Sequence, residues 1–568
     1  MDGNSPLKPS RFGRTVWLTL LLASAFAPIA AAQPPAPPPA APPDYFSGSG
    51  TTKDGKPKWP DPTGQHTGAA VTPAADGKGD PNPAAMSNQD LYDRIAHNAV
   101  SINLVWVLVC GFLVMFMQAG FALVETGLCR SRNAAHVMAM NFMIYPLACL
   151  GFWAYGFAIG WGNWTNGPVP AGWYSTLGPG TAGLDSGFGL GPVFDDQNKA
   201  TGKYTYGLFG TKGFFLAGVD DVSVFALFFF MMVFMDTTAT IPTGAMAERW
   251  AWHNFVLFGL WVAFPYCLVA NWVWGGGWLA QAGLNWGFGH GAVDFAGSGV
   301  VHLMGGAISL AGVLAIGPRI GKYHDGKPAA VPGHNLPMVV LGTFILAFGW
   351  FGFNAGSSLA GTDLRISVVV VNTMLGSAGG AAGAQLALWY KKMKPDPSML
   401  CNGMLAGLVA ITAGCAFVDS WAAVLIGLAA GLIVVNSVLF LEDRGLDDPV
   451  GAMSVHGVNG IWGLVALGLF ANGKYGAGWN GVERPAFVAR YGSDGVRGLL
   501  YGDASQLVAQ VLDAVVIAVA GFVLAAVWFE FSNRITPLRV TADEETRGLD
   551  ITELGTQAYT DRTSTPNT

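Results

Sequence analysis

Charged residues are scarce in this chain, and their scarcity excludes an ordinary soluble protein. Lys, Arg, Asp and Glu together make up 12% of the 568 residues, whereas about 25% is usual in soluble domains. The net charge of −6 argues against a nucleic-acid partner, which would require a basic surface. With 52% hydrophobic residues and a mean hydropathy of +0.40, the composition indicates a protein that crosses the lipid bilayer several times.

Cysteine is also rare. The six cysteines fall in or beside apolar segments, and they show neither the spacing of a disulfide framework nor that of a metal site. No ATP-binding motif accompanies the apolar segments. We therefore expect no cofactor, no bound metal and no ATP-driven activity from this chain.

The N-terminus carries a basic segment and a short apolar run. Lys8, Arg11 and Arg14 precede the apolar residues 16–29 and three alanines at 30–32. This order is typical of a signal peptide with a small-residue cleavage site. A retained membrane helix is the alternative, but the run is short for a span. We predict a signal peptide at 1–32 and, at 33–97, a disordered periplasmic leader whose Pro, Ala and Gly cannot form a core.

Eleven apolar segments follow, and about 20 residues suffice to cross a bilayer as a helix. The segments lie at 98–126, 135–162, 222–246, 252–273, 293–317, 337–360, 366–390, 399–417, 421–441, 451–472 and 507–532. The sequence thus predicts an all-α polytopic membrane protein with eleven transmembrane helices in a domain at 98–532. A cytoplasmic tail follows at 533–568.

Basic residues in the short loops give the predicted orientation. The loops after the first, third, fifth, seventh and ninth segments hold ten Lys and Arg residues, whereas the short loops after the fourth, sixth and eighth hold only Arg365. Cytoplasmic loops are enriched in Lys and Arg. We therefore place the mature N-terminus outside and the C-terminus inside, in a bacterial cell inner membrane.

Two histidines follow an aspartate at the same interval: His302 follows Asp294, and His456 follows Asp448. This pattern indicates an inverted repeat of five plus five helices, which would bring the two histidines in from opposite faces. Eight helical residues rise about 12 Å, and half of the hydrocarbon core is about 15 Å, so both side chains are expected near the midplane.

These four residues have structural interpretations as well. A membrane histidine is functional by default, but it can also serve as a hydrogen bond between helices. Each aspartate can simply cap the helix that follows it, or it can orient a site. Two histidines at symmetric depth favour a role in a transport pathway.

Other side chains suit the binding of a small cation near the outer face. Trp274 ends the fourth segment and Ser357 lies in the sixth, and an indole face and a hydroxyl can both bind a cation. Phe230 and Phe234 lie one helical turn apart in the third segment. Taken singly, Trp274 fits an interfacial belt residue, and the phenylalanines fit plain packing.

Five motifs, in order along the chain, resemble the ammonium transporter (Amt/Mep/Rh) family. They are MQAGFALVETG at 117–127, GAMAER at 244–249, DFAG at 294–297, GWFGFNAGS at 349–357 and VHGVNG at 455–460. The resemblance covers about 98–560. It implies a transporter rather than an enzyme, eleven helices per subunit, and a homotrimer with one pore per subunit.

The resemblance also implies roles for residues at the outer half of the pore. Trp274 and Ser357 resemble an external ammonium-binding vestibule. Asp294 resembles the carboxylate that supports this vestibule without touching the cation. Phe234 and Phe353 resemble the stacked gate beneath it.

Deeper in the pore, His302 and His456 resemble the twin histidines of the family. The tail sequence RVTADEETRGLD at 539–550 resembles the regulatory cytoplasmic C-terminus, which implies a possible PII signalling protein as a partner. Asp236 departs from the family pattern, in which small or apolar residues are common. We expect it to face away from the gate and to pair with Thr237, Thr240 or another helix rather than act in transport.

The predicted function is ammonium uptake. A cation recruited at the vestibule sheds a proton, and ammonia crosses an apolar pore that a potassium ion cannot enter without a large desolvation penalty. An ammonium sensor is the alternative. An enzyme acting within the membrane is disfavoured, because the two histidines lack the third ligand of a catalytic metal.

Overall fold

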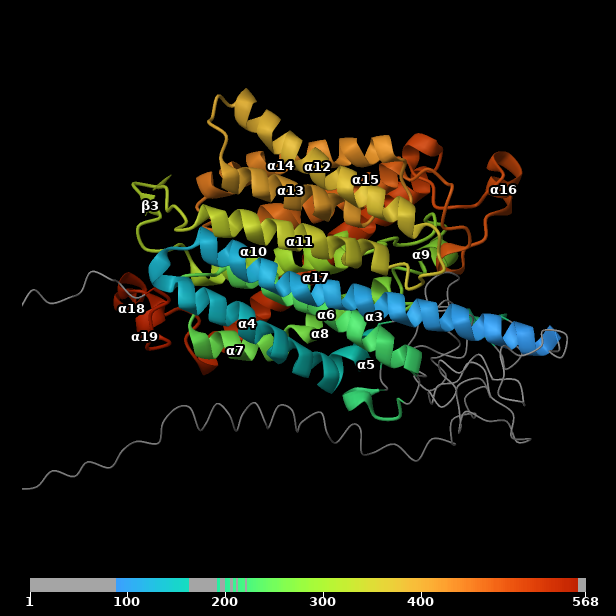
Figure 1. Ribbon diagram of the computed structural model, residues 1–568, viewed down its shortest axis with the longest axis horizontal. Coiled ribbons are helices and arrows are strands. Elements are labelled where there is room, and N and C mark those ends of the chain that lie inside the picture. Colours follow the sequence, from blue (N-terminus) through green and yellow to red (C-terminus); the bar gives the residue numbers. More distant parts are fainter. Residues whose placement is uncertain are drawn as a thin grey trace, which may run out of the picture.

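The long helices run side by side along one axis of the molecule (Figure 1). The computed structural model describes residues 88–162, 192–194, 200–204, 208–210, 213–219 and 222–559. The predicted signal peptide at 1–32 lies outside the described residues, as does the leader up to residue 87. The first long helix begins at Asn88, so the end of the predicted leader is helical.

Within the described residues, ten helical segments are long and apolar enough to cross a membrane, by length and composition. The helices that form them are α3 (Asn88–Leu128), α4 (Ala134–Gly151), η3 (Phe152–Gly156) and α5 (Phe157–Trp161), α6 (Val222–Ala245), α7 (Trp252–Trp261) and α8 (Ala263–Val273), η5 (Ser298–Leu303) and α10 (Met304–Ile316), α11 (Leu336–Gly356), α12 (Ile366–Tyr390), α14 (Ser420–Asp443), η6 (Met453–Val458) and α15 (Asn459–Phe470), and α17 (Ala504–Ile535). The predicted segment at 399–417 overlaps α13 (Pro397–Thr412), which has 16 residues. The helical, membrane-spanning architecture is confirmed, whereas the count of eleven, the inverted repeat and the orientation stay predictions.

Short elements cover the two ends of this bundle. Figure 1 shows α18 and α19 near the hairpin strand β3 at one end, and α9 and α16 at the other. The short elements are η2 (Ser131–Asn133), β1 (Pro192–Phe194), β2 (Ala200–Tyr204), η4 (Phe214–Leu216), α9 (Ala282–Trp286), β3 (Tyr323–His324), β4 (Lys327–Pro328), η7 (Trp479–Gly481), α16 (Pro485–Tyr491), η8 (Leu499–Tyr501), α18 (Ala542–Arg547) and α19 (Leu549–Thr552). The strands form two antiparallel pairs, β1 with β2 and β3 with β4, and the second pairs Tyr323 with Pro328.

Burial separates central helices from peripheral ones. Every residue in 230–250, within and after α6, is buried, and so is every residue in 289–309, which includes η5. Helix α17 instead exposes Val515, Val519 and Val523 at four-residue spacing. An apolar row of this kind suits contact with lipid, because soluble proteins rarely expose extended apolar patches.

Glycines allow helices α12, α13 and α14 to approach closely. A Cβ atom at Gly380 would collide with the backbone of Gly403 and Gly407, and one at Gly431 would collide with the backbone of Gly380. Small residues at helix contacts are typical of membrane proteins, in which association depends on close van der Waals packing.

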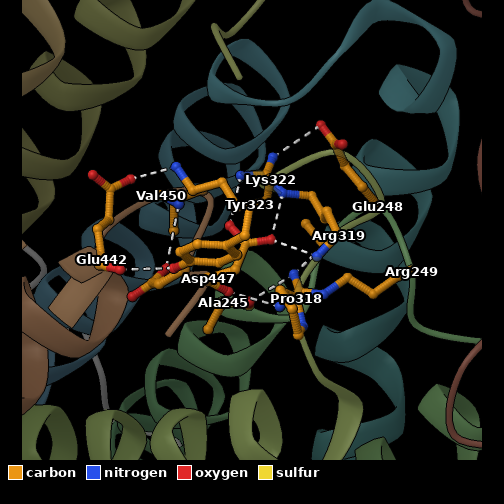
Figure 2. A network of polar contacts seen from close by, with 12 residues as sticks. Ala245, Glu248, Arg249, Pro318, Arg319, Lys322, Tyr323, Glu442, Asp447 and Val450 are labelled. Atoms are coloured by element: carbon orange, nitrogen blue, oxygen red, sulfur yellow. Dashed lines mark hydrogen bonds and ion pairs between the residues drawn. The ribbon is translucent and has the colours of Figure 1, made fainter. Parts of the chain in front are cut away.

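A network of buried charges joins the loops that follow α6, α10 and α14 (Figure 2). Arg319 binds both carboxylate oxygens of Asp447, from Nε and Nη2, at 2.9 Å each. Arg249 donates from Nη2 to the backbone oxygen of Asp447 at 2.7 Å. Glu248 forms an ion pair with Arg319 at 3.5 Å and a second ion pair with Arg130. Because Arg130 follows α3, the loops after α3, α6, α10 and α14 are held as one unit.

The charges in this network depend on one another. Burial alone would raise the pKa of Asp447, but the hydrogen bonds from Arg319 and the charges of Arg249 and Arg319 lower it to about 2. For Arg319, burial opposes the charged form, but the hydrogen bond to Asp447 and the charge of Glu248 hold its pKa above the ordinary value. The pair thus stays ionised, as a buried pair must if its partners are to satisfy each other.

The C-terminal tail docks against the same loops. Arg539 donates to the backbone oxygens of Ile316 and Pro318 at 2.9 and 2.7 Å, and it pairs with Glu545. Glu545 in turn accepts from the backbone N–H of Ile320 at 2.7 Å. Thr541 and Glu544 form a capping box that starts α18. The tail is thus an ordered part of the fold as far as residue 559.

Candidate functional site

Two segments of the same local design carry the histidines. The carboxylate of Asp294 accepts from the backbone N–H groups three and five residues later, those of Gly297 and Gly299, and Asp448 does the same with Gly451 and Met453. The residue three positions after each aspartate is a glycine with positive φ, 112° and 81°, a conformation that favours glycine. A π-helical turn follows in each case, η5 or η6, and such turns are frequent at functional sites.

These turns bring the two imidazoles together. The Nδ1 atoms of His302 and His456 lie 3.2 Å apart, and their ring centroids 5.2 Å apart. Both side chains are buried, and the Nε2 atom of His302 has no hydrogen-bond partner in the part of the chain that the structure describes. If both rings are neutral, one donates its Nδ1–H and the other accepts it. The Nε2 atom of His302 thus remains available for a further hydrogen bond.

Aromatic rings continue from His302 toward the predicted vestibule. Phe353 stacks on His302 at 5.5 Å and on Phe234 at 3.9 Å, with 15° between the two phenyl planes. Phe234 in turn meets Trp274 edge to face at 6.1 Å. The predicted gate and the predicted histidine pair are therefore adjacent in one column of rings, and Trp274 stands at its far end.

The predicted vestibule residues are anchored to this column. The indole Nε1 of Trp274 donates to the backbone oxygen of Asp294 at 2.7 Å. Ser357 donates its hydroxyl to the backbone oxygen of Phe353 at 2.8 Å, at the end of α11. The side chain of Asp294 is occupied by the backbone N–H groups of its own turn, including that of Val300. It thus supports the indole and the turn through its backbone and carboxylate.

Trp350 belongs to the site but was not identified from the sequence. Its ring stacks on His302 at 5.0 Å, and its Nε1 donates to Thr412 at 2.9 Å. This hydrogen bond fixes the indole against the imidazole. Its only sequence signal is its place in the motif at 349–357, three residues before Phe353.

A cavity adjoins the histidine pair on the side of His456. Its lining includes Phe121, Glu125 and Val450 as well as His456, and Phe121 lies 6.0 Å from the His456 ring. Glu125 also was not identified from the sequence. Its signal was a single carboxylate in the apolar run at 117–127, one helical turn after Phe121.

The expectation for Asp236 was wrong in part. Asp236 is buried, but its Oδ1 atom has no hydrogen-bond partner among the described residues. Thr237 donates to the backbone of Val233, and Thr240 donates to Asn141. Neither threonine therefore pairs with the carboxyl group, because each hydroxyl hydrogen is used elsewhere.

Comparisons with known proteins identify the family of this chain. The model of the Ammonium Transporter Family matches residues 105–559. The chain belongs to the ammonium transporter family. It is 44% identical to Ammonium transporter Amt2 of Archaeoglobus fulgidus over 81% of this chain and 88% of that protein. It is 34% identical to the ammonium transporter of Bacillus subtilis over 80% and 98%.

Solved structures show the same fold. A structure described as a sensor Amt protein superposes with a TM-score of 0.65 and 32% identity, over 80% of this chain and 99% of that one. Mep2 of Candida albicans gives a TM-score of 0.61 and 26% identity, over 78% and 87%. This transporter family therefore accounts for the helical bundle, and its members are transporters rather than enzymes.

Proposed function

We propose that this transporter takes up ammonium from the periplasm across the bacterial inner membrane. The observation that carries the proposal is the pair of imidazoles, with Nδ1 atoms 3.2 Å apart, at the end of an aromatic column in a member of the ammonium transporter family. The relatives named above transport ammonium according to their descriptions. Ammonium transport supplies a chemical purpose for each part of the column.

The outer part of the column suits recruitment of a cation. The indole of Trp274 offers a π face, and Ser357 offers a hydroxyl oxygen near the same end. A desolvated cation over an indole gains about 2 kcal/mol or more, which offsets part of its lost hydration. The carboxylate of Asp294 adds negative charge behind the indole. The stacked rings of Phe234 and Phe353 then close the path until they move.

The inner part of the column suits ammonia rather than an ion. A charged species pays heavily to enter an apolar pore. Ammonium avoids this by leaving a proton behind, whereas potassium has no proton to lose. Neutral imidazoles at His302 and His456 can bind ammonia by hydrogen bonds and pass a proton between their nitrogens.

The same proposal includes the assembly and its orientation. The matched Asp-to-His turns of η5 and η6 support an inverted five-plus-five repeat. Arg130, Arg249 and Arg319 lie with the docked tail at one end of the bundle, which supports a cytoplasmic C-terminus. We further propose a homotrimer in the lipid bilayer, and a PII signalling protein that binds this cytoplasmic end. The signal peptide at 1–32 belongs to the same arrangement.

Electrical recording on solid-supported membranes tests the transport function. Purified protein in liposomes is exposed to pulses of ammonium chloride and of potassium chloride. We expect a transient current with ammonium and none with potassium, and none from empty liposomes. A protein that binds ammonium, as shown by calorimetry, but carries neither current nor ammonia flux would overturn the proposal.

That last result would favour a second function, an ammonium sensor. The similarity to the structure described as a sensor Amt protein favours this alternative. A sensor requires the vestibule and the docked tail but no large flux. Ammonium-dependent changes in tail protection, measured by hydrogen exchange without transport, would support it.

A further inference from the structure

Glu125 lines the cavity next to His456, and the transport steps proposed for the vestibule, the gate and the histidines do not use it. The residue comes from α3, one turn after Phe121, whose ring faces His456 at 6.0 Å. The same cavity is lined by Val450 and Ala452 from the segment that leads into η6. It therefore lies on the side of the histidine pair opposite the stacked phenylalanines, toward the end where the tail docks.

The carboxyl group of Glu125 is held by neutral groups. Asn141 of α4 donates to it from Nδ2 at 2.6 Å. The Thr243 hydroxyl of α6 lies 3.0 and 2.9 Å from its two oxygens and 2.5 Å from the backbone oxygen of Thr240. The side chain is 2% exposed. Across the described helices, no Lys or Arg forms an ion pair with it. Such a carboxyl can hold either a proton or a charge, and no cation fixes the choice.

The supporting contacts continue away from the cavity. The Thr243 hydroxyl lies 3.4 Å from that of Thr240, and Gln118 donates to both Thr240 and Asn141. These contacts fix the position of the carboxyl group from three helices. The titratable groups near it are His456, in the same cavity, the buried thiol of Cys129 four residues later, and Asp448, whose oxygens are taken by backbone N–H groups. Glu125 is therefore the acid best placed to exchange a proton with a molecule that has passed His456.

We propose that Glu125 is the proton donor that converts ammonia back to ammonium on the inner side of the histidine pair. This inference rests on the proposed function. In the step, the carboxylic acid O–H bond breaks and a fourth N–H bond forms, so a carboxylate and an ammonium ion result. The proton that ammonium left at the outer side reaches Glu125 through His302 and His456 and restores the acid. The proton and ammonia thus recombine at Glu125, on the inner side of the histidine pair.

The test compares Glu125→Gln with Glu530→Gln, which alters an exposed carboxylate on α17, in the same liposomes. At position 125 the Gln side chain can keep its hydrogen bonds, because the Thr243 hydroxyl can accept as well as donate, but it has no proton to exchange. We expect Glu125→Gln to lower the ammonium current by at least about tenfold, since loss of a general acid usually costs about 100-fold or more. Glu530→Gln should carry the parental current.

Glu125→Asp supplies a second readout that a structural role would not move. It keeps an acid with a different intrinsic pKa, so the current should persist with a shifted dependence on the pH inside the liposomes. If Glu125→Gln does not fold, this shift decides alone. An unchanged pH profile in Glu125→Asp, or equal currents in Glu125→Gln and the parent, would overturn the inference and leave the proposed function intact. A parent protein without ammonium current would overturn both.

Discussion

The Nδ1 atoms of His302 and His456 lie 3.2 Å apart, although 154 residues separate them in the chain. The pair is central to the proposed relay. We expect His302→Leu/His456→Leu to fold into the same oligomer as the parent but to lose ammonium-driven current. The reason is that leucine fills similar space and offers no nitrogen to a proton. Recording on solid-supported membranes measures the current, and size-exclusion chromatography measures the oligomer.

The matched control is His324→Leu, which alters an exposed histidine in β3. It should transport like the parent. A single acidic replacement, His302→Asp, should place a fixed charge in the pore and admit potassium. If the double leucine variant carries parental ammonium currents, the histidines are packing residues and the relay is wrong.

Trp274 provides the second prediction. Its ring meets Phe234, and its Nε1 holds the backbone oxygen of Asp294. We expect Trp274→Leu to raise the half-saturating ammonium concentration roughly two- to thirtyfold, since a cation–π contact contributes about 0.5 kcal/mol at an exposed site and about 2 kcal/mol when desolvated. Trp274→Phe keeps a π face but loses the N–H group. Its half-saturating ammonium concentration should therefore lie between those of the parent and Trp274→Leu. Trp421→Leu, at an exposed position of α14, is the control. An unchanged concentration dependence in Trp274→Leu would remove this residue from the site.

The sequence predicted those parts of the site that follow from spacing along one helix or from a repeated pattern. The Asp-to-His interval occurs twice, and the structure gives both copies the same hydrogen bonds and a π-helical turn. The family motifs predicted that Phe234 and Phe353 stack, and the two rings lie 3.9 Å apart; their role as a gate stays a prediction. Both kinds of information depend only on residues near one another in the chain.

Residues whose environment comes from several helices were missed. Glu125 is one carboxylate in an apolar run, and its partners Asn141 and Thr243 lie on two other helices. Arg319 and Asp447 pair across 128 residues of chain, with no spacing to indicate it. The expectation for Asp236 was wrong in part because Thr240 bonds to Asn141 of another helix, whereas Thr237 bonds to the backbone of its own helix.

Asp294 provides the third prediction, and here the structure sharpens the sequence argument. Asn caps helices about as well as Asp in general. Here, however, both oxygens of Asp294 accept hydrogen bonds from backbone N–H groups. The NH2 group of Asn would replace one of these oxygens and would face N–H donors that it cannot accept from. We expect Asp294→Asn to lower both the melting temperature and the transport rate. The melting temperature is measured by thermal unfolding in detergent.

Asp448→Asn is the matched control, because that carboxylate makes the same contacts beside the other histidine. Both variants should lose similar stability. If the charge of Asp294 supports cation recruitment, only Asp294→Asn should raise the half-saturating ammonium concentration. Equal half-saturating ammonium concentrations in the two variants would indicate that Asp294 serves only as a helix cap.

Asp447 yields a prediction about pH. Its pKa is lowered to about 2 in the fold, from about 3.9 in an unfolded chain. The charged form is thus favoured by folding, so its contribution is full above pH 4 and is lost as the pH falls toward 2. The difference corresponds to roughly 2 kcal/mol at neutral pH. We expect Asp447→Asn to unfold at a lower temperature than the parent at pH 7, and the gap to narrow below pH 4. A gap that does not change with pH would show that the ionised pair with Arg319 contributes nothing.

The last prediction concerns the tail. Truncation after Asn533 removes Arg539 and Glu545, and with them the contacts to the backbone of Ile316, Pro318 and Ile320. The membrane helices keep their own contacts, so the oligomer should assemble. The loop that follows α10 loses its contacts with the tail, and we expect a lower or unregulated ammonium current. Arg539→Ala should produce a milder form of the same defect, whereas Arg534→Ala, which alters an exposed pair on α17, should not.

Addition of a PII protein distinguishes a regulatory role of the tail from a purely structural one. Added to the inner side, it should change the current of the parent and of Arg534→Ala but not that of the truncated chain. Arg539→Ala should respond weakly, because its tail remains but is poorly docked. If the truncated protein transports normally and still responds to the PII protein, the docked tail has no regulatory role, and its hydrogen bonds to the loops serve only to hold the end of the chain.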